Sequence, residues 1–226
     1  MTRGPAGEAL AALAARASCS AICDAMMRRH AHRAHVVGLV SPCPERALLG
    51  PAVTMRFLPL RRDRLEPARH DFEPLLLEAV GDEPEGRVLV VSSGGYPEAA
   101  LAGGRKLSRL RNLGLAGILA DGRLRDFAEV AELGIAAWCR GETVRQGGDV
   151  LMPFEVNVPV ALDGVTVFPG DWVYADAAGA VVMPAADATA LLEEAVRIDE
   201  RDAATVARVR AEDRARLAAR DAAAGG

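Results

Sequence analysis

The 226-residue sequence predicts an α/β fold, in which a sheet with parallel strands is flanked by helices from the two ends of the chain. Apolar segments of strand length recur through the middle of the chain, and helical segments separate the earlier ones. This alternation is typical of parallel sheets, because each helix carries the chain back to the edge where the next strand begins. Ala-rich segments with helical spacing lie on either side of this region.

The predicted strands are short apolar runs bounded by glycine, proline or charged residues. They cover residues 51–58, 88–92, 116–120, 135–139, 156–162, 165–167, 172–175 and 181–183. Helices are expected at residues 72–80, 98–113 and 126–133. The pair Asp163-Gly164 is a hairpin signal, so we expect the later strands to form short antiparallel additions or a small barrel-like layer.

The two ends of the chain are predicted to be helical. Residues 8–33 indicate one broken helix or two short ones, with Ser18 and Ser20 as candidate caps, and this segment is expected to cover one face of the sheet. Residues 187–220 contain no proline or glycine and predict one long helix. Its apolar stripe is confined to the first turns, so the rest is expected to face solvent or another subunit. We interpret residues 1–226 as a single domain.

Composition excludes several classes of protein. A net charge of −4 and 4% aromatic residues disfavour direct nucleic-acid binding. The sequence lacks the run of about 18 apolar residues that a membrane span needs, and the N-terminal segment lacks a signal-peptide core, so we expect a cytoplasmic protein. Four cysteines are too few for a disulfide scaffold at this length. Two of the cysteines, Cys19 and Cys23, lie near His30, His32 and His35 in the sequence, but the spacing of these five residues fits no structural zinc pattern.

Arg125 and Asp126 are the first candidate site residues. They follow an Asp-Gly turn at the end of the predicted strand 116–120, and ligands of α/β sheets gather at the carboxyl ends of strands. An arginine there can bind a carboxylate with two parallel hydrogen bonds, and an aspartate is a hard oxygen ligand for Mg²⁺ or Mn²⁺. In the other interpretation, Asp126 caps the following helix and Arg125 is solvated.

The segment Gly103-Gly104-Arg105-Lys106 is the second candidate. Its glycine pair can present backbone N–H groups to a carboxylate or phosphate, although the sequence contains neither glycine-rich nucleotide motif. Lys106 is the only lysine among 27 basic residues, an imbalance that an arginine-rich composition also explains. His70 could act as an acid or base, but its context favours a surface histidine.

Several segments together resemble the RraA-like family, which includes 4-hydroxy-4-methyl-2-oxoglutarate aldolases, 4-carboxy-4-hydroxy-2-oxoadipate aldolases and the regulator of ribonuclease activity A. The resemblance spans about residues 22–195, and its most specific element is the Asp-Gly-x-x-Arg-Asp run that ends at Asp126. The other segments are Gly50-Pro51-Ala52-Val53-Thr54, Gly86-Arg87-Val88-Leu89-Val90-Val91, Asn157-Val158-Pro159-Val160 and Pro169-Gly170-Asp171.

The resemblance implies an α/β/α swivelling-domain-like sandwich that assembles as a homotrimer or as a hexamer. It implies a metal-dependent aldolase that releases pyruvate from a 4-hydroxy-2-oxo-dicarboxylate, with oxaloacetate decarboxylation as a side activity. Carried onto this chain, Asp126 matches the metal ligand and Arg125 matches the arginine that holds the substrate. Gly103 to Lys106, which include Gly104 and Arg105, match the loop that binds the substrate carboxylate.

The sequence also departs from the family pattern. An acidic residue usually stands at position 104, where this chain has Gly104, so a Mg²⁺ or Mn²⁺ ion is expected to be held more weakly. Arg105 and Lys106 replace apolar residues, which favours a more highly charged substrate or a metal-independent reaction. Two further hypotheses follow: a keto-acid enzyme that forms a Schiff base on Lys106, and a non-catalytic oligomer that binds a protein partner.

Overall fold

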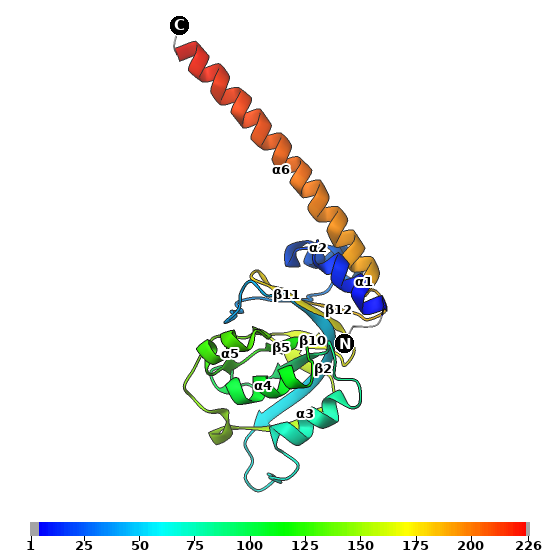
Figure 1. The fold of residues 1–226 in the computed structure, drawn as a ribbon, viewed down its shortest axis with the longest axis vertical. Coiled ribbons are helices and arrows are strands. Elements are labelled where there is room, and N and C mark those ends of the chain that lie inside the picture. The colour runs from blue at the N-terminus through cyan, green and yellow to red at the C-terminus, as the bar shows by residue number, and fades with distance from the viewer. Residues whose placement is uncertain (1–4, 225–226) are drawn as a thin grey trace.

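The computed structural model describes residues 5–224, in which eight strands form one mixed sheet (Figure 1). The path across the sheet is β1-β12-β11-β2-β3-β5-β7, and β8 pairs with β2 beside this path. These strands are β1 (His35–Val36), β2 (Leu48–Pro59), β3 (Val88–Ser92), β5 (Gly117–Ala120), β7 (Ala136–Trp138), β8 (Leu151–Val156), β11 (Trp172–Asp176) and β12 (Gly179–Met183). The predicted α/β class is confirmed.

Strand β2 organises the sheet because its two halves have different partners. Its first half pairs antiparallel with β11, and its second half pairs antiparallel with β8. On its other edge β2 pairs parallel with β3, which continues through β5 to β7 in parallel register. The helices between these parallel strands are α3 (Phe72–Val80), α4 (Gly104–Asn112) and α5 (Phe127–Leu133). The parallel half therefore has the strand–helix alternation that the sequence predicts.

The two faces of the sheet are covered by different elements. Val53 and Met55 of β2 pack in the core cluster that contains the buried residues of α3, α4 and α5. Ala52 belongs to the opposite cluster, together with the buried residues of the hairpin formed by β9 (Val160–Leu162) and β10 (Val165–Val167). Alternate residues of one strand thus bury against helices on one side and against a β-hairpin on the other. The hairpin turn predicted at Asp163-Gly164 is confirmed.

The end segments form a third packed cluster with β11 and β12. It contains α1 (Pro5–Ala14), α2 (Cys19–His30) and the beginning of α6 (Ala188–Ala224). Ser18 caps α2, because its side chain accepts a hydrogen bond from the backbone of Ala21. All four residues of the predicted stripe in the last helix are buried, namely Leu191, Leu192, Ala195 and Ile198. Beyond residue 200 the helix extends away from the domain (Figure 1).

Within residues 5–224 no single helix is both long and apolar enough to cross a membrane. The segments Gly7–Ala14 and Cys19–His30 reach the required length and composition only as a pair, which is bent by 111° at the break.

The helix predicted at residues 98–113 is wrong in its first third. Residues Ala100–Ala102 form strand β4, which pairs parallel with the two-residue strand β6 (Arg123–Leu124). Alanine favours helices, but here tertiary pairing with β6 outweighs that preference. Helix α4 starts only at Gly104, after the extended residue Gly103.

The strand predicted at residues 156–162 is two strands. Strand β8 ends at Val156, and β9 begins at Val160. Asn157 between them has a φ of 52°, in the left-handed region that interrupts a strand, and Pro159 has no N–H to donate. Strand β8 starts earlier than predicted because Leu151 and Met152 pair with the end of β2.

Gly117 marks a position in β5 where only glycine fits. A Cβ atom there would lie 2.1 Å from the carbonyl oxygen of Ala136 and 2.7 Å from Leu48. We predict that Gly117→Ala lowers the free energy of unfolding by about 1–3 kcal/mol, because the parallel strands would have to separate. Urea denaturation would measure this, with Gly148→Ala as the control because no atom lies within 4 Å of its added methyl group. Equal stability of the two variants would contradict the packing argument.

Candidate active site

The candidate site lies beyond the carboxyl ends of β3 and β5. The carboxylate of Asp121, directly after β5, accepts a hydrogen bond of 2.5 Å from the backbone N–H of Ser93, directly after β3. This bond ties the two strand ends together. The chain then continues from each end into the small β4–β6 pair, which precedes α4 and α5. Both predicted site segments therefore follow strand ends that are joined by this hydrogen bond.

The glycine pair at the start of α4 is in close contact with α5. A Cβ atom on Gly103 would lie 2.6 Å from a carboxylate oxygen of Asp126, and one on Gly104 would lie 2.2 Å from the carboxylate of Glu129. Neither glycine has a positive φ, so close approach rather than backbone conformation explains them. Glu129 thus occupies the space into which a side chain at position 104 would project. No local pattern predicted this role of Glu129, although the residue lies one helical turn after Asp126.

The side chain of Asp126 makes no capping hydrogen bond, so the interpretation of Asp126 as a helix cap holds only for its backbone position. It occupies the N-cap position of α5, but its carboxylate accepts a hydrogen bond of 3.1 Å from the backbone N–H of Gly104. The N–H of Phe127 donates instead to the carboxylate of Glu142, at 2.8 Å. Asp126 also has left-handed backbone angles, φ 62° and ψ 43°, which cost about 1 kcal/mol for a residue with a side chain. Glu142 thereby leaves Asp126 available for the site.

Arg125 lies beside Asp126 with its side chain partly exposed. Its backbone N–H donates to the carbonyl of Ala102 at 2.9 Å, which fixes it to β4. Its Nε lies 4.0 Å from the Asp126 carboxylate, and each of the two side chains is 41% exposed. An arginine held only by this long contact keeps N–H groups for a ligand carboxylate.

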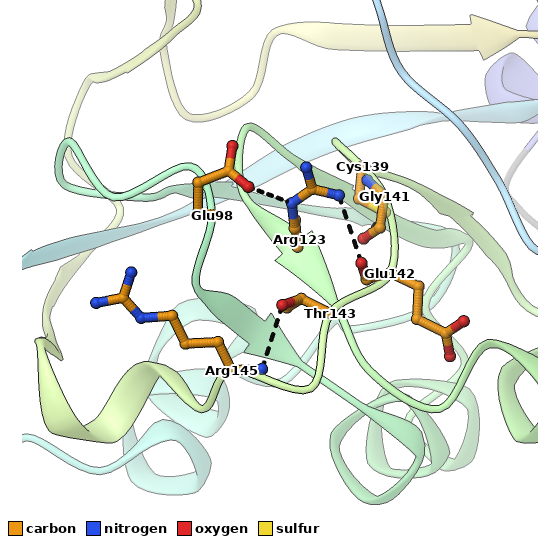
Figure 2. Close-up of polar contacts among 7 residues, drawn as sticks. All are labelled: Glu98, Arg123, Cys139, Gly141, Glu142, Thr143 and Arg145. Atoms are coloured by element: carbon orange, nitrogen blue, oxygen red, sulfur yellow. Dashed lines mark hydrogen bonds and ion pairs between the residues drawn. The ribbon is translucent and has the colours of Figure 1, made fainter.

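The loop that follows β7, around residues 139–145, contacts β4, β6 and the start of α5. Figure 2 shows Arg123 of β6 between Glu98 and the backbone of Glu142, with hydrogen bonds of 2.7 Å and 3.4 Å. The same loop contacts β4, because the N–H of Ala100 donates to the carbonyl of Arg145 at 3.0 Å. These contacts place Glu142 at the start of α5.

A cavity of about 520 Å³ opens at this place, which is large enough for a small organic acid. Gly103 forms part of its wall, whereas Gly104 faces Glu129. The cavity is rich in charged and titratable side chains, with three basic residues against two acidic ones. These lining residues are His70, Asp71, Arg105, Lys106, Arg125 and Asp126. The predicted residues Arg105, Lys106, Arg125 and Asp126 thus share one cavity.

Lys106 is partly buried in the wall of this cavity. Its Nζ donates to the carbonyl of Leu101 at 2.9 Å and lies 4.3 Å from the centre of the Phe72 ring. Burial lowers the pKa of Lys106 to about 8, against the opposite effect of Asp71 and with a smaller contribution from Arg105. The ordinary pKa is 10.5, so burial at this site makes loss of the proton easier.

The prediction that His70 is a surface histidine is wrong. Its side chain lines the cavity, and the residue is only 8% exposed. The backbone N–H of Glu66 donates to Nδ1 at 3.0 Å, and the ring stacks on Phe154 at 5.0 Å between centroids. Because Nδ1 accepts a hydrogen bond, the neutral ring carries its proton on Nε2. The polar context of Arg69-His70-Asp71 concealed this burial, which depends on β8.

The side chains of the cavity make an incomplete metal site. Asp126 offers one carboxylate, and one of its oxygens already accepts the N–H of Gly104. Among residues 5–224 there is no group of three or more His, Cys, Asp and Glu side chains that could hold a metal ion. Mg²⁺ is usually held by one or two carboxylates, with water and substrate oxygens completing its coordination, so Asp126 as the main protein ligand would hold such an ion only weakly. Cys23 and His35, far from this cavity in the fold, form a thiol–imidazole contact of 3.4 Å.

A model of the RraA-like family, described as Aldolase/RraA, matches residues 19–182. The chain belongs to the RraA-like family. The matched range includes both segments that line the cavity, from Gly103 to Lys106 and from Arg125 to Asp126.

Two relatives of this RraA-like chain carry the name "Putative 4-hydroxy-4-methyl-2-oxoglutarate aldolase". The protein from Halalkalibacterium halodurans is 32% identical over 120 residues, which cover 53% of this chain and 57% of the relative. The protein from Burkholderia mallei is 34% identical over 142 residues, which cover 61% of this chain and 75% of the relative. The match thus spans little more than half the length of the first relative.

A solved structure resembles nearly the whole RraA-like chain. Streptomyces coelicolor RraAS2, described as an unusual member of the RNase ES inhibitor RraA protein family, has a TM-score of 0.75 and 32% identity. The similarity covers 90% of this chain and 98% of that protein. The family thus joins proteins named as aldolases with proteins named as ribonuclease inhibitors, and only the site can distinguish these functions.

We predict that Gly104→Asp lowers the free energy of unfolding by about 1–2 kcal/mol, because the new side chain meets the carboxylate of Glu129. Adding Glu129→Ala should remove most of this cost, with a coupling energy of about 0.5–2 kcal/mol. Adding Glu132→Ala, at an exposed position of the same helix, is the matched control and should leave the cost unchanged. Chemical denaturation of the single and double variants measures the coupling, and additive costs would show that Glu129 does not occupy this space.

We predict a pH-dependent stability difference between the wild type and Lys106→Met. The pKa of Lys106 falls from 10.5 to about 8 on folding, so between these pH values the unfolded chain binds more protons than the folded one. The contribution of Lys106 to the free energy of unfolding therefore rises with pH in this window and is constant below it. Relative to the variant, the wild type should gain stability from pH 8 to pH 10. Urea denaturation at several pH values tests this, and a constant difference would contradict a desolvated Lys106.

Proposed function

We propose that this protein is a carbon–carbon lyase that cleaves a 4-hydroxy-2-oxo-dicarboxylate by a retro-aldol reaction and releases pyruvate. The observation that supports this proposal is the shared cavity of Arg125, Asp126, Arg105 and Lys106. Its excess of positive charge suits a dianionic substrate. The names of the relatives from Halalkalibacterium halodurans and Burkholderia mallei favour the same reaction.

Arg125 is proposed to bind the 1-carboxylate and the 2-oxo group of the substrate. Cleavage of the bond between C3 and C4 leaves negative charge on the pyruvate fragment, and fixed cations next to this charge lower the barrier. Asp126 is proposed to accept the proton of the 4-hydroxyl group, since its carboxylate is partly exposed in the same cavity. Decarboxylation of oxaloacetate leaves the same charge on a pyruvate fragment, so we expect it as a second activity.

A divalent cation on Asp126 stays a prediction. When bound there, such an ion would polarise the 2-oxo group of the substrate. Because the donor set of the chain fits it poorly, we assign no step to it and expect weak affinity.

Assembly is a further part of the proposal. We expect a homotrimer or hexamer, with a small keto acid as the ligand and neither nucleic acid nor a membrane as a direct partner. The second candidate function is a non-catalytic oligomer that binds a protein partner. It is favoured by the likeness to RraAS2, which is described as belonging to a ribonuclease-inhibitor family.

We predict that Arg125→Lys lowers kcat/KM for 4-hydroxy-4-methyl-2-oxoglutarate by about 100-fold, because lysine cannot replace the planar pair of N–H donors. Asp126→Asn should lower kcat by about 100-fold or more, since the amide accepts no proton. Pyruvate release from this acid and from oxaloacetate is measured with Mg²⁺, with Mn²⁺ and with EDTA. Arg216→Lys, at an exposed position of α6, serves as the control.

Each outcome of this assay has a separate meaning. Release that depends on Arg125 and Asp126 supports the lyase. Absence of turnover of both acids by the folded protein, with and without metal, would contradict the lyase and favour the binding oligomer.

A further inference from the structure

Lys106 is chemically different from every other basic side chain in the protein. The other 26 basic residues are arginines, whose guanidinium groups stay protonated and cannot act as nucleophiles. An unprotonated lysine can attack a carbonyl carbon. The only side-chain amine of the chain therefore lies in the cavity that holds the candidate site.

The position of this amine suits a ligand in the cavity. The first turn of α4 carries Lys106, and its Nζ lies 4.3 Å from the ring centre of Phe72 and 5.8 Å from that of Phe57. Its hydrogen bond to the carbonyl of Leu101 uses one N–H and leaves the nitrogen lone pair free when the amine is neutral. Both rings line the same cavity as Lys106, so the nitrogen lies at the cavity wall, where the carbonyl carbon of a bound ligand can reach it.

The surroundings of Lys106 increase the fraction of its neutral form. Burial is the main cause that lowers its pKa to about 8, and Arg105 adds to it, whereas Asp71 opposes it. The other titratable groups of the cavity are His70, Arg125 and Asp126. About a tenth of Lys106 is then unprotonated at pH 7, against less than about a thousandth of an ordinary lysine.

We propose that Lys106 is a covalent catalytic residue that forms an imine with the 2-oxo group of a keto acid bound in this cavity. Arg125, in the same cavity, holds the carboxylate next to that oxo group. The substrate class rests on the proposed function, but formation of the imine does not depend on turnover.

The covalent steps balance as follows. The neutral amine of Lys106 adds to C2 of the keto acid, loss of one water gives a C=N bond, and one proton from solvent protonates its nitrogen; the final hydrolysis returns that proton to solvent. Asp126 takes the proton of the 4-hydroxyl group, and the electron pair of that O–H bond forms a carbonyl group at C4. The bond between C3 and C4 breaks, its electron pair moves toward the nitrogen to give an enamine, and the C4 fragment leaves as an oxo acid. Asp126 returns the proton to C3, and one water hydrolyses the imine to release pyruvate and the free lysine.

An imine on Lys106 would supply the electron acceptor that a weakly held metal ion does not. The electron pair of the broken bond needs an acceptor, and a protonated imine is one. The cavity offers a desolvated amine next to cations, whereas its carboxylates are too few for a well-held ion. Cleavage through Lys106 should therefore persist in EDTA.

Reduction with borohydride tests the proposal directly. The purified protein is incubated with pyruvate, treated with sodium cyanoborohydride and examined by intact and peptide mass spectrometry. Reduction of the imine adds about 72 Da per pyruvate to one amine. We expect this addition on the peptide that contains Lys106. Because the chain has no other lysine, the N-terminal amine is the one competing primary amine, and the peptide analysis separates the two.

Two variants make the result specific. Lys106→Arg keeps the charge but removes the amine, so the internal adduct should disappear. The double variant Lys106→Arg with Arg109→Lys moves the only lysine about one turn along α4, to an exposed position beside Glu73, and should form at least 10-fold less adduct. Circular dichroism confirms that both variants are folded.

The outcomes separate this inference from the proposed function. An adduct on Lys106 together with EDTA-resistant pyruvate release supports both. An adduct without turnover supports the imine site and contradicts the lyase. Absence of the Lys106 adduct at saturating pyruvate, or an equal adduct on the relocated lysine, overturns the imine proposal. Metal-dependent release without an adduct leaves the lyase in place and also overturns the imine.

Discussion

The candidate site depends on the contact between two glycines that begin α4 and two carboxylates that begin α5. Gly103 and Gly104 let the Asp126 and Glu129 side chains approach the backbone of α4 closely, and the N–H of Gly104 binds Asp126 directly. This contact joins the β4–Gly103 segment to the β6–Asp126 segment across the end of the sheet. With larger residues at both positions, the side chains of Asp126 and Glu129 would have to shift.

The sequence predicted the parts of the fold that local patterns determine. The parallel strands β3, β5 and β7, the helices α3 and α5 and the long last helix all follow from hydrophobic spacing and glycine positions. Strand β4 could not be predicted this way, because Ala100–Ala102 favours a helix and becomes a strand only by pairing with β6. Long-range pairing of this kind leaves no local signal.

In the candidate site too, some residues could be predicted from local sequence, whereas others depend on long-range contacts. Its residues from Gly103 to Lys106 and from Arg125 to Asp126 stood out through residue type and position after a strand. All of them line one cavity except Gly104, which faces Glu129. His70 was noted as a possible acid or base but predicted to lie at the surface, because the sequence does not show the stacking on Phe154 and the hydrogen bond from Glu66 that bury it. The capping role of Glu142 depends on a loop that reaches α5 from β7. Contacts between distant segments decide which polar residue is buried and which is solvated.

The long last helix has a consequence for how the molecule moves in solution. Residues 201–218 of α6 are exposed, and the helix continues to Ala224 (Figure 1). At 1.5 Å per residue, this projecting part extends for about 35 Å, comparable to the diameter of a domain of this size. A particle with such a projection diffuses more slowly than a sphere of the same mass. Its elution volume in gel filtration will therefore suggest too large a mass, so the number of subunits has to come from light scattering or sedimentation equilibrium.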